Sequence, residues 1–208
     1  MRVTLKLATS LDGRIATGSG ESKWITGEAA RVEGHRLRAG HDAVMVGVET
    51  VLADDPELTV RLPRSDEIRQ PLRVVLDSRL RTPATARLAN PGTMILTAAE
   101  PRPVGTAEVE RVEAPDGRPA PAPALEALAR RGCASVLIEG GGQVAASFLG
   151  AGLVDRLEWF RAPILLGGDG RPCVAALALA KLADAPKFRR VSAEPVGDDL
   201  WERYDAIR

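Results

Sequence analysis

The chain has 208 residues, enough to bury one sizeable core and to form one domain or two small ones. Its 28 Lys and Arg residues balance 28 Asp and Glu residues, so no net charge favours nucleic acid or an anionic membrane, and an anionic ligand must be met by a local cluster of cations. An apolar content of 45% indicates a globular protein, and no apolar run approaches the length of a membrane span.

The cysteines and histidines predict no metal site. Cys133 and Cys173 form no C-x-x-C motif, and only His35 and His41 could complete a zinc site, so we assign all four residues to structure or surface. Free thiols favour a reducing compartment, and the start of the chain, MRVTLKLATSLDGR, has no apolar leader segment. We therefore expect a cytoplasmic protein.

Apolar and β-branched runs predict the strands. The segments with strand character, in chain order, are residues 2–8, 43–47, 72–76, 93–97, 109–112, 136–138, 154–160, 187–195 and 200–207. Continuous apolar runs such as 43–47 suggest burial on both faces and parallel pairing. The last two segments, joined at Gly197 and Asp198, resemble an antiparallel pair.

Helices are predicted between these strands. Helical patterns cover residues 28–38, 48–53, 125–131 and 143–149, with a helical turn expected within residues 172–182. Residues 62–71 are a polar loop, and the Pro-rich residues 114–123 read as a surface linker. Strands that alternate with helices and end in an antiparallel pair predict an α/β fold with a mixed, mainly parallel central sheet, in a single domain over residues 1–208.

The stretch VLIEGGGQVAASFL, residues 136–149, is the centre of the functional interpretation. A strand that ends at Glu139, three glycines and a helix start would present backbone N–H groups and a positive dipole end to a phosphate. The spacing matches neither G-x-G-x-x-G nor the P-loop motif. The alternative is a close backbone crossing without a ligand.

Lysine is rare in this chain, with four residues against 24 arginines. Lys6 nevertheless lies within the first predicted strand. A partly buried lysine can release a proton near neutral pH, whereas arginine cannot. Lys6 is therefore a candidate for proton handling.

Five ordered motifs carry a resemblance to a known family. KLATSLDGRIATGSGESKWIT, RVEGHRLRAGHDAVMVGVETVLADDPELTVR, QPLRVVLDS, LIEGG and AGLVDRLEWFRAPILLGG resemble the riboflavin-biosynthesis pyrimidine reductases. The chain is most similar to the reductase half of the bacterial bifunctional deaminase/reductase. The zinc deaminase motifs H-x-E and P-C-x-x-C are absent, so we expect no deaminase domain and no deaminase activity.

The resemblance implies a dihydrofolate-reductase-like, three-layer α/β/α fold and a homodimer, with residues 154–160 and the closing strands as the expected contact. It implies NADPH-dependent reduction of the ribose of 5-amino-6-(5-phosphoribosylamino)uracil to a ribityl chain. By similarity, the residues that contact NADPH are Ala8, Trp24, Thr50, Asp54, Ser78, Gly141, Gly142, Gln143, Val144, Ala145, Ala146 and Ser147. The residues that bind the substrate are Ser22, Arg38, Leu58, Arg61 and Glu139.

The chemistry of this reaction suits several of these residues. Arg38 and Arg61 can each grip two oxygens of a substrate phosphate, although any one arginine could be a solvated surface residue. The glycosylamine must open to an imine, and Lys6 and Asp54 are the candidates for protonating or orienting it. Alternatively, Asp54 or Asp55 only ends the helix before Pro56.

Other candidates carry alternatives of their own. Ser78 and Arg79 suit the 2′-phosphate of NADPH, whereas the adjacent Asp77 would suit NADH or could serve as a turn carboxylate. Glu139 would accept hydrogen bonds from the pyrimidine or from the amides of its own loop. Trp24 would form a wall of the cofactor site or belong to the core.

Three other functions compete with this interpretation. A dihydrofolate reductase would need a carboxylate such as Glu28 or Glu33, and its motifs fit less well. Reduction of the undeaminated 2,5-diaminopyrimidinone differs by one amino group. A nucleotide-binding module without catalysis should have lost Lys6, Asp54 or the substrate arginines, and all of them are present.

Overall fold

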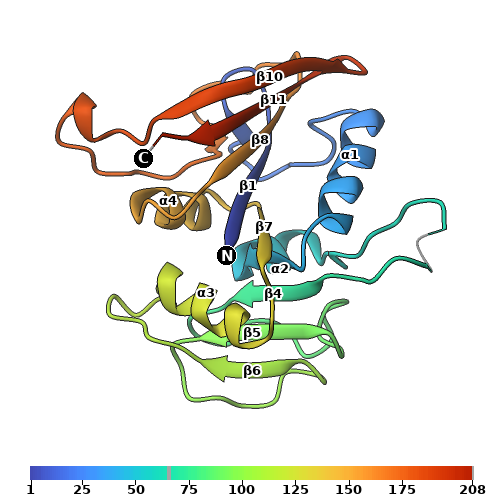
Figure 1. The fold of residues 1–208 in the computed structure, drawn as a ribbon, viewed down its shortest axis with the longest axis vertical. Coiled ribbons are helices and arrows are strands. Elements are labelled where there is room, and N and C mark those ends of the chain that lie inside the picture. Colours follow the sequence, from blue (N-terminus) through green and yellow to red (C-terminus); the bar gives the residue numbers. More distant parts are fainter. Residues whose placement is uncertain (65–66, 208) are drawn as a thin grey trace. The chain divides into compact units, whose positions relative to one another are not determined.

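The computed structural model describes residues 1–64 and 67–207, and the chain divides into two compact units (Figure 1). Unit 1 consists of Met1–Arg2 and His35–Gly141, and unit 2 consists of Val3–Gly34 and Gly142–Arg208. The boundary falls within helix α1, Glu28–Ala39. A single folding domain therefore stays a prediction. The predicted loop 62–71 includes positions 65 and 66, which lie outside the described residues.

Unit 1 contains a parallel sheet with the strand order β7-β3-β4-β5-β6. Its strands are β3 (Ala43–Gly47), β4 (Leu72–Leu76), β5 (Thr93–Thr97), β6 (Glu108–Arg111) and β7 (Ser135–Glu139). All residues of β3, β5 and β7 are buried, because the sheet is covered on both faces.

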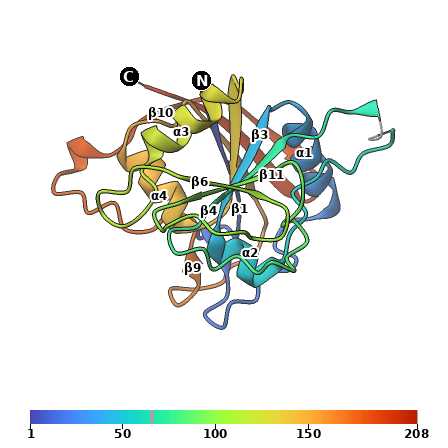
Figure 2. The same cartoon turned by 90° about the horizontal axis from the view of Figure 1, so that it is seen from below.

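Two helices lie on opposite sides of this sheet (Figure 2). Helix α2, Val48–Asp54, follows β3, and its Val48 and Val51 belong to an apolar cluster with Val46 and Val75. Helix α3 is Pro121–Arg130 and buries three residues, namely Ala124, Ala127 and Leu128. Side chains alternate along a strand, so one set of apolar residues serves each face.

Unit 2 contains strands in the order β10-β11-β8-β1. These are β1 (Arg2–Thr9), β8 (Arg156–Arg161), β10 (Phe188–Val196) and β11 (Asp199–Ala206). Strand β8 runs parallel to β1 and antiparallel to β11, and β11 runs antiparallel to β10. A second, small sheet pairs β2 (Arg14–Ala16) with β9 (Arg171–Pro172), and helix α4 is Gly142–Gly150.

The carboxylate of Asp12 fastens two loops of unit 2 to one another. It accepts hydrogen bonds from the Ser10 hydroxyl at 2.6 Å and from the backbone N–H groups of Leu166 and Gly167 at 3.1 and 2.8 Å. These bonds, the Ser10 hydroxyl first, lower the pKa of Asp12 to about 2. The SLDGR and LLGG motifs of the sequence therefore form one joined structure.

The predicted fold class is confirmed: strands β3, β4, β5, β6 and β7 pair in parallel, as do β1 and β8, and the chain closes with antiparallel strands. Two local predictions are wrong. The expected linker over residues 114–123 contains the start of α3, because Pro121 and Pro123 lie in the first helical turn, where proline removes no helical hydrogen bond. Residues 172–182 form no α-helix, and Ala178 at φ 50° interrupts any right-handed helix there.

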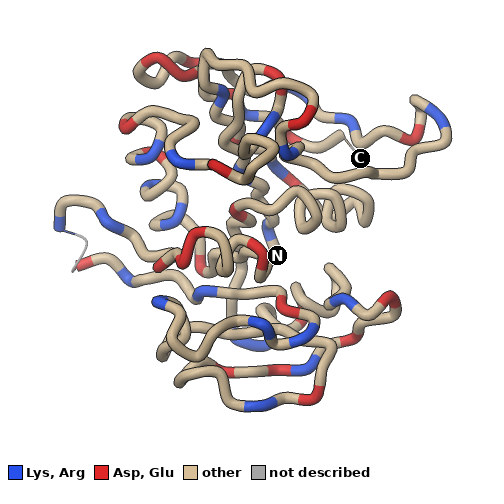
Figure 3. The backbone as a smooth tube through the Cα atoms, turned by 180° about the vertical axis from the view of Figure 1, so that it is seen from behind, with Lys and Arg blue, Asp and Glu red and all other residues tan. Residues whose placement is uncertain are grey.

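Charge is evenly mixed in the structure. Figure 3 shows Lys and Arg residues interspersed with Asp and Glu along both units. Among the described residues, no helix has the length and apolar character needed to cross a membrane. No group of three His, Cys, Asp or Glu residues within 1–64 and 67–207 could hold a metal ion.

Candidate functional site

Several predicted site residues of unit 1 follow neighbouring parallel strands. Glu139 ends β7, Thr50 lies in the first turn of α2 after β3, and Ser78 follows β4. The carboxyl ends of parallel strands meet at one edge of a sheet, which is where α/β proteins bind ligands. A Cβ built on Gly140 would lie 3.6 Å from Thr50 Oγ1, so the chain after β7 passes close to α2.

The structure brings Arg38 and Glu139 into a bidentate ion pair. Arg38 Nε donates to Glu139 Oε1 at 2.5 Å, and Nη2 donates to Oε2 at 2.9 Å. Burial opposes the charge of Arg38, but the charge and hydrogen bonds of Glu139 outweigh it and raise the pKa of the guanidinium. The pair is therefore ionised, and it fixes the orientation of the carboxylate.

Arg61, the second predicted phosphate ligand, is far more open. Its side chain is 56% exposed, and Nη1 donates to Glu57 Oε2 at 3.1 Å. Arg87 also binds the carboxylate of Glu57. Two guanidinium groups thus share the carboxylate of Glu57.

The structure resolves the role of Asp77. Its Oδ2 accepts hydrogen bonds from the backbone N–H and the hydroxyl of Thr82, at 2.7 and 2.8 Å, and its side chain is fully buried. Oδ1 accepts a longer bond from Arg79 N–H at 3.4 Å. Asp77 is thus the turn carboxylate that the sequence left open, whereas Ser78 beside it is only partly buried.

The two aspartates after α2 differ. Asp55 adopts the left-handed conformation, with φ 40°, and caps the helix, as its N–H donates to the carbonyl of Val51. Asp54 is the last helical residue and is exposed. Asp55 therefore ends the helix, as one of the two readings of the sequence expected.

The glycine stretch has the backbone that its sequence predicts. Gly140 and Gly141 have φ of 79° and 85°, a region that side chains disfavour, and α4 begins at Gly142. A Cβ on Gly142 would lie 2.6 Å from the carbonyl oxygen of Pro172, so only glycine fits. Within α4, Gln143 and Ser147 are exposed, Val144 and Ala146 are half-buried, and Ala145 is buried.

In unit 2, Lys6 lies on the less buried face of β1 together with Ala8. The Lys6 ammonium is 6.0 Å from the centroid of the Phe160 ring, which stacks on Trp201 at 5.1 Å. The indole N–H of Trp201 donates to Glu158 at 2.7 Å. Lys6 thus lies beside an aromatic pair that a buried carboxylate orients.

Trp24 does not belong to the core, because its side chain is 72% exposed. Arg31 lies over its ring, with the guanidinium carbon 4.6 Å from the centroid. Ser22, in the same loop, is half-buried. A large exposed aromatic surface suits ligand contact better than a structural role.

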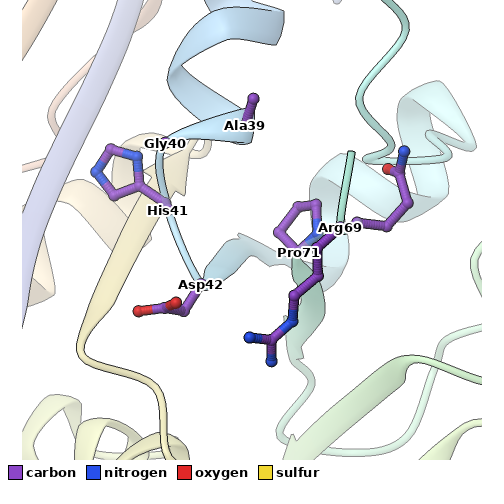
Figure 4. A pocket seen from close by; sticks show the side chains of 7 residues that line it. Ala39, Gly40, His41, Asp42, Arg69 and Pro71 are labelled. Carbon is purple, nitrogen blue, oxygen red and sulfur yellow. The ribbon is translucent and has the colours of Figure 1, made fainter. Parts of the chain in front are cut away.

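A pocket of about 190 Å³ lies away from these residues (Figure 4). It is lined by residues 39–42 and 69–71, which precede β3 and β4 and so lie at the amino ends of the strands. Asp42 accepts three hydrogen bonds from Ala134 and Ser135, and His41 Nδ1 bonds the carbonyl of Leu37 at 2.6 Å. None of the predicted site residues lines this pocket.

Sequence reasoning assigned His35 only to structure or surface and did not single out Glu158 or Gln70. His35 accepts a hydrogen bond from the backbone of Arg61, and Gln70 binds the backbone of Val60. Glu158 is buried, and burial raises its pKa. The H-x-x-R spacing of His35 and Arg38, which places both on one helix face, could have indicated a joint role.

Comparison with known proteins identifies a family. The family model described as the RibD C-terminal domain matches residues 1–201. The riboflavin biosynthesis protein RibD of Bacillus amyloliquefaciens is 39% identical over 95% of this chain and 55% of its own length.

Solved structures agree with the sequence match. RibD of Acinetobacter baumannii has a TM-score of 0.87 and 32% identity over 99% of this chain and 58% of its own. A Thermotoga maritima protein described as a diaminohydroxyphosphoribosylaminopyrimidine deaminase/5-amino-6-(5-phosphoribosylamino)uracil reductase has a TM-score of 0.81 and 31% identity, over 99% of this chain and 56% of its own. The chain thus spans little more than half the length of these relatives.

Proposed function

The chain belongs to the family of RibD C-terminal domains, and from this we propose that it is an NADPH-dependent reductase of 5-amino-6-(5-phosphoribosylamino)uracil in riboflavin biosynthesis. The observation that carries the proposal is the ionised Arg38–Glu139 pair, which lies at the carboxyl end of β7 in the same unit as the open cation Arg61. A fixed carboxylate suits a pyrimidine, and an exposed guanidinium suits a phosphate.

The residues of the chain fit NADPH as the cofactor. The buried Asp77 carboxylate accepts two hydrogen bonds from Thr82, so it is not available for the ribose hydroxyls of NADH. The adjacent Ser78 can donate a hydrogen bond to the 2′-phosphate of NADPH. Further contacts would come from Thr50, from exposed Trp24, and from Gly141 and the residues that follow it, where backbone N–H groups favour phosphate. When bound, NADPH supplies the hydride for the reduction.

Substrate binding follows from the polar groups of unit 1. Arg38 uses three of its five N–H donors on Glu139 and on the Thr59 carbonyl, so at most two remain for a ligand. A carboxylate oxygen can accept more than one hydrogen bond, so Glu139 can take an amino or ring N–H of the pyrimidine while Arg38 holds it. The phosphate would then be gripped mainly by Arg61.

Lys6 and Asp54 are the residues we assign to the proton step. The open-chain imine of the substrate accepts hydride at C1′ once its nitrogen is protonated or hydrogen-bonded by an acid. The Lys6 ammonium lies 6.0 Å from the centroid of the Phe160 ring, and we assign it as the proton donor. Asp54 is exposed and can orient the protonated nitrogen.

The assay is to mix the protein with NADPH and freshly generated 5-amino-6-(5-phosphoribosylamino)uracil and to follow the dihydronicotinamide absorbance. We expect oxidation with this substrate and none with dihydrofolate. If NADPH is oxidised only with the undeaminated diaminopyrimidinone, that compound is the substrate instead. If it is oxidised only with dihydrofolate, the assignment to riboflavin biosynthesis is wrong. Lys6→Ala and Asp54→Asn should each slow turnover by about 10²-fold or more if they act in the proton step.

We place this enzyme in the cytoplasm as a homodimer. Strand β8 is hydrogen-bonded by β1 and β11 on its two sides, so its edges are used within the chain. Strand β10 is mostly exposed along its nine residues and is therefore the better contact. Light scattering of the purified protein tests this, and a monomer at micromolar concentration would contradict it.

A further inference from the structure

Residues 57–61, all of them within the described part of the chain, belong to no helix or strand. The segment carries Leu58 and Arg61, two of the predicted substrate ligands. Leu58 is buried with φ 55°, so the backbone makes an unfavourable turn just before Thr59. A segment of this kind needs partners outside a sheet to keep one conformation.

Side chains supply these partners to three consecutive residues. Arg38 Nη1 donates to the carbonyl of Thr59 at 3.0 Å. Gln70 binds Val60 on both sides, because Oε1 accepts its N–H at 2.8 Å and Nε2 donates to its carbonyl at 3.3 Å. The N–H of Arg61 donates to His35 Nδ1 at 3.2 Å. The backbone of this segment is thus hydrogen-bonded to side chains of α1 and to Gln70, rather than to a neighbouring strand.

His35 and Arg38 act from one face of α1. They are three residues apart, a spacing that makes side chains neighbours on a helix surface. Arg38 is itself fixed by its ion pair with Glu139 at the end of β7. The anchor of the segment is therefore connected to the carboxylate that we assign to the pyrimidine.

The hydrogen bond to Arg61 fixes the chemical state of His35. Nδ1 can accept an N–H only when the imidazole is neutral and its proton is on Nε2. Burial, with the charges of Arg38 and Arg61, lowers the pKa of His35, although Glu139 and the Thr59 backbone act in the opposite direction. The imidazole is thus neutral near pH 7 and ready to accept.

We propose that His35 is a positioning residue for the substrate phosphate: it accepts the Arg61 N–H and thereby sets the backbone from which the Arg61 guanidinium reaches its ligand. The proposal rests on the proposed function, in which Arg61 grips that phosphate. His35 itself need not touch the substrate. Its loss should weaken binding of the phosphorylated substrate and leave NADPH binding and the chemical step nearly unchanged.

Two variants of His35 and one of His41 test this. His35→Leu removes the acceptor, whereas His35→Asn keeps an acceptor oxygen two bonds from Cβ, where Nδ1 stood. His41→Leu is the matched control, because this histidine bonds the carbonyl of Leu37, within its own helix region, and not the backbone of residues 59–61. All three are measured for kcat, for KM with 5-amino-6-(5-phosphoribosylamino)uracil, and for KM with NADPH.

We expect His35→Leu to raise KM for the phosphorylated substrate about tenfold, the equivalent of about 1.4 kcal/mol and the size of one hydrogen bond. Its kcat and its KM for NADPH should stay within about twofold, His35→Asn should recover most of the loss, and His41→Leu should behave as wild type. An unchanged substrate KM in His35→Leu, an equal rise in KM for NADPH, or no recovery in His35→Asn would overturn the proposal.

Amide hydrogen exchange of a peptide that spans residues 59–61 separates this proposal from the proposed function, because it needs no turnover. Faster exchange in His35→Leu that returns to the wild-type rate in His35→Asn supports the anchor, even if the wild-type protein reduces none of the substrates. In that case the reductase assignment would fail and the anchor would stand. Unchanged exchange in His35→Leu would overturn the anchor whatever the activity.

Discussion

The two units bury a strand-borne glutamate in different ways. In unit 1, Glu139 is held by the Arg38 guanidinium through two hydrogen bonds. In unit 2, Glu158 accepts a neutral indole N–H from Trp201 at 2.7 Å, and Arg156 and Arg203 offset its burial only in part. Burial therefore raises the pKa of Glu158, whereas Glu139 has a full charge partner.

The two carboxylates therefore differ in their charge partners. Glu139 is paired with a cation that stabilises its anionic form, whereas burial disfavours the anionic form of Glu158. A buried ion pair adds little net stability, because desolvation offsets the attraction, but removing one partner is costly. The pair of unit 1 is therefore better explained by function than by stability. Glu158 is not held by such a bidentate ion pair, so its burial should affect how the stability of the protein depends on pH.

Breaking the pair from the cation side should have the largest effect. Arg38→Met leaves Glu139 buried without its charge partner, and we expect a loss of about 3–5 kcal/mol in the free energy of unfolding. Urea denaturation measures this, with Arg36→Met, on the exposed side of the same helix, as the control. A loss no larger than that of the control would show that the pair is not a coupled unit.

Removing both partners should restore the fold without restoring function. In the double variant Arg38→Met with Glu139→Leu, no charge stays buried, so stability should return to within about 1 kcal/mol of wild type. Reductase activity should be lost, because the carboxylate for the pyrimidine is gone. A double variant that is as unstable as Arg38→Met alone, or that keeps activity, would contradict this account of the pair.

Glu158→Gln should change the pH dependence of stability. The folded pKa of Glu158 lies above its ordinary value of 4.5, so its contribution is complete below that value and is lost as pH rises through the folded pKa. Glutamine keeps an acceptor for Trp201 and does not titrate. Wild-type Tm should therefore fall relative to the Glu158→Gln variant between pH 4.5 and pH 8, and a constant difference would contradict the prediction.

Substitution of Asp12 should have the smallest effect on stability, and its pH dependence should have the opposite sign to that of Glu158. Hydrogen bonds from Ser10 and from the Leu166 and Gly167 amides lower its pKa from 3.8 to about 2. Its contribution is thus present above pH 3.8 and is lost as pH falls toward 2. The Tm difference between wild type and Asp12→Asn should shrink over this range, and a difference independent of pH would show that the carboxylate charge does not hold the loops together.

Local patterns predicted most of the fold. Apolar runs located β3, β4 and β5 to the residue, and β3 and β5 are buried along their whole length, which gives a strand a continuous apolar composition. The prediction for residues 114–123 was wrong because their prolines indicated a linker. Proline is also compatible with the first turn of a helix, which is where Pro121 and Pro123 lie. The Ala- and Leu-rich residues 172–182 show the converse, since helix propensity is weak against tertiary context.

The candidate site was predicted as a set of residues rather than as a set of contacts. The resemblance named Arg38 and Glu139 separately, but only the structure joins them. The roles of His35 and Gln70 could not be predicted from the sequence, because each binds backbone groups of a segment that lies elsewhere in the chain. Spacing along one element predicts a shared face, whereas the partner across space depends on how the chain folds.

The most direct test of the central claim is to follow the hydride itself. NADPH that carries deuterium at C4 of the nicotinamide, labelled on either face in separate reactions, is incubated with the protein and 5-amino-6-(5-phosphoribosylamino)uracil, and the product is analysed by mass spectrometry. The account predicts a ribitylamino product that contains one deuterium at C1′ from one of the two labelled cofactors. A reduced product without deuterium from either cofactor, or no product at all, would contradict it.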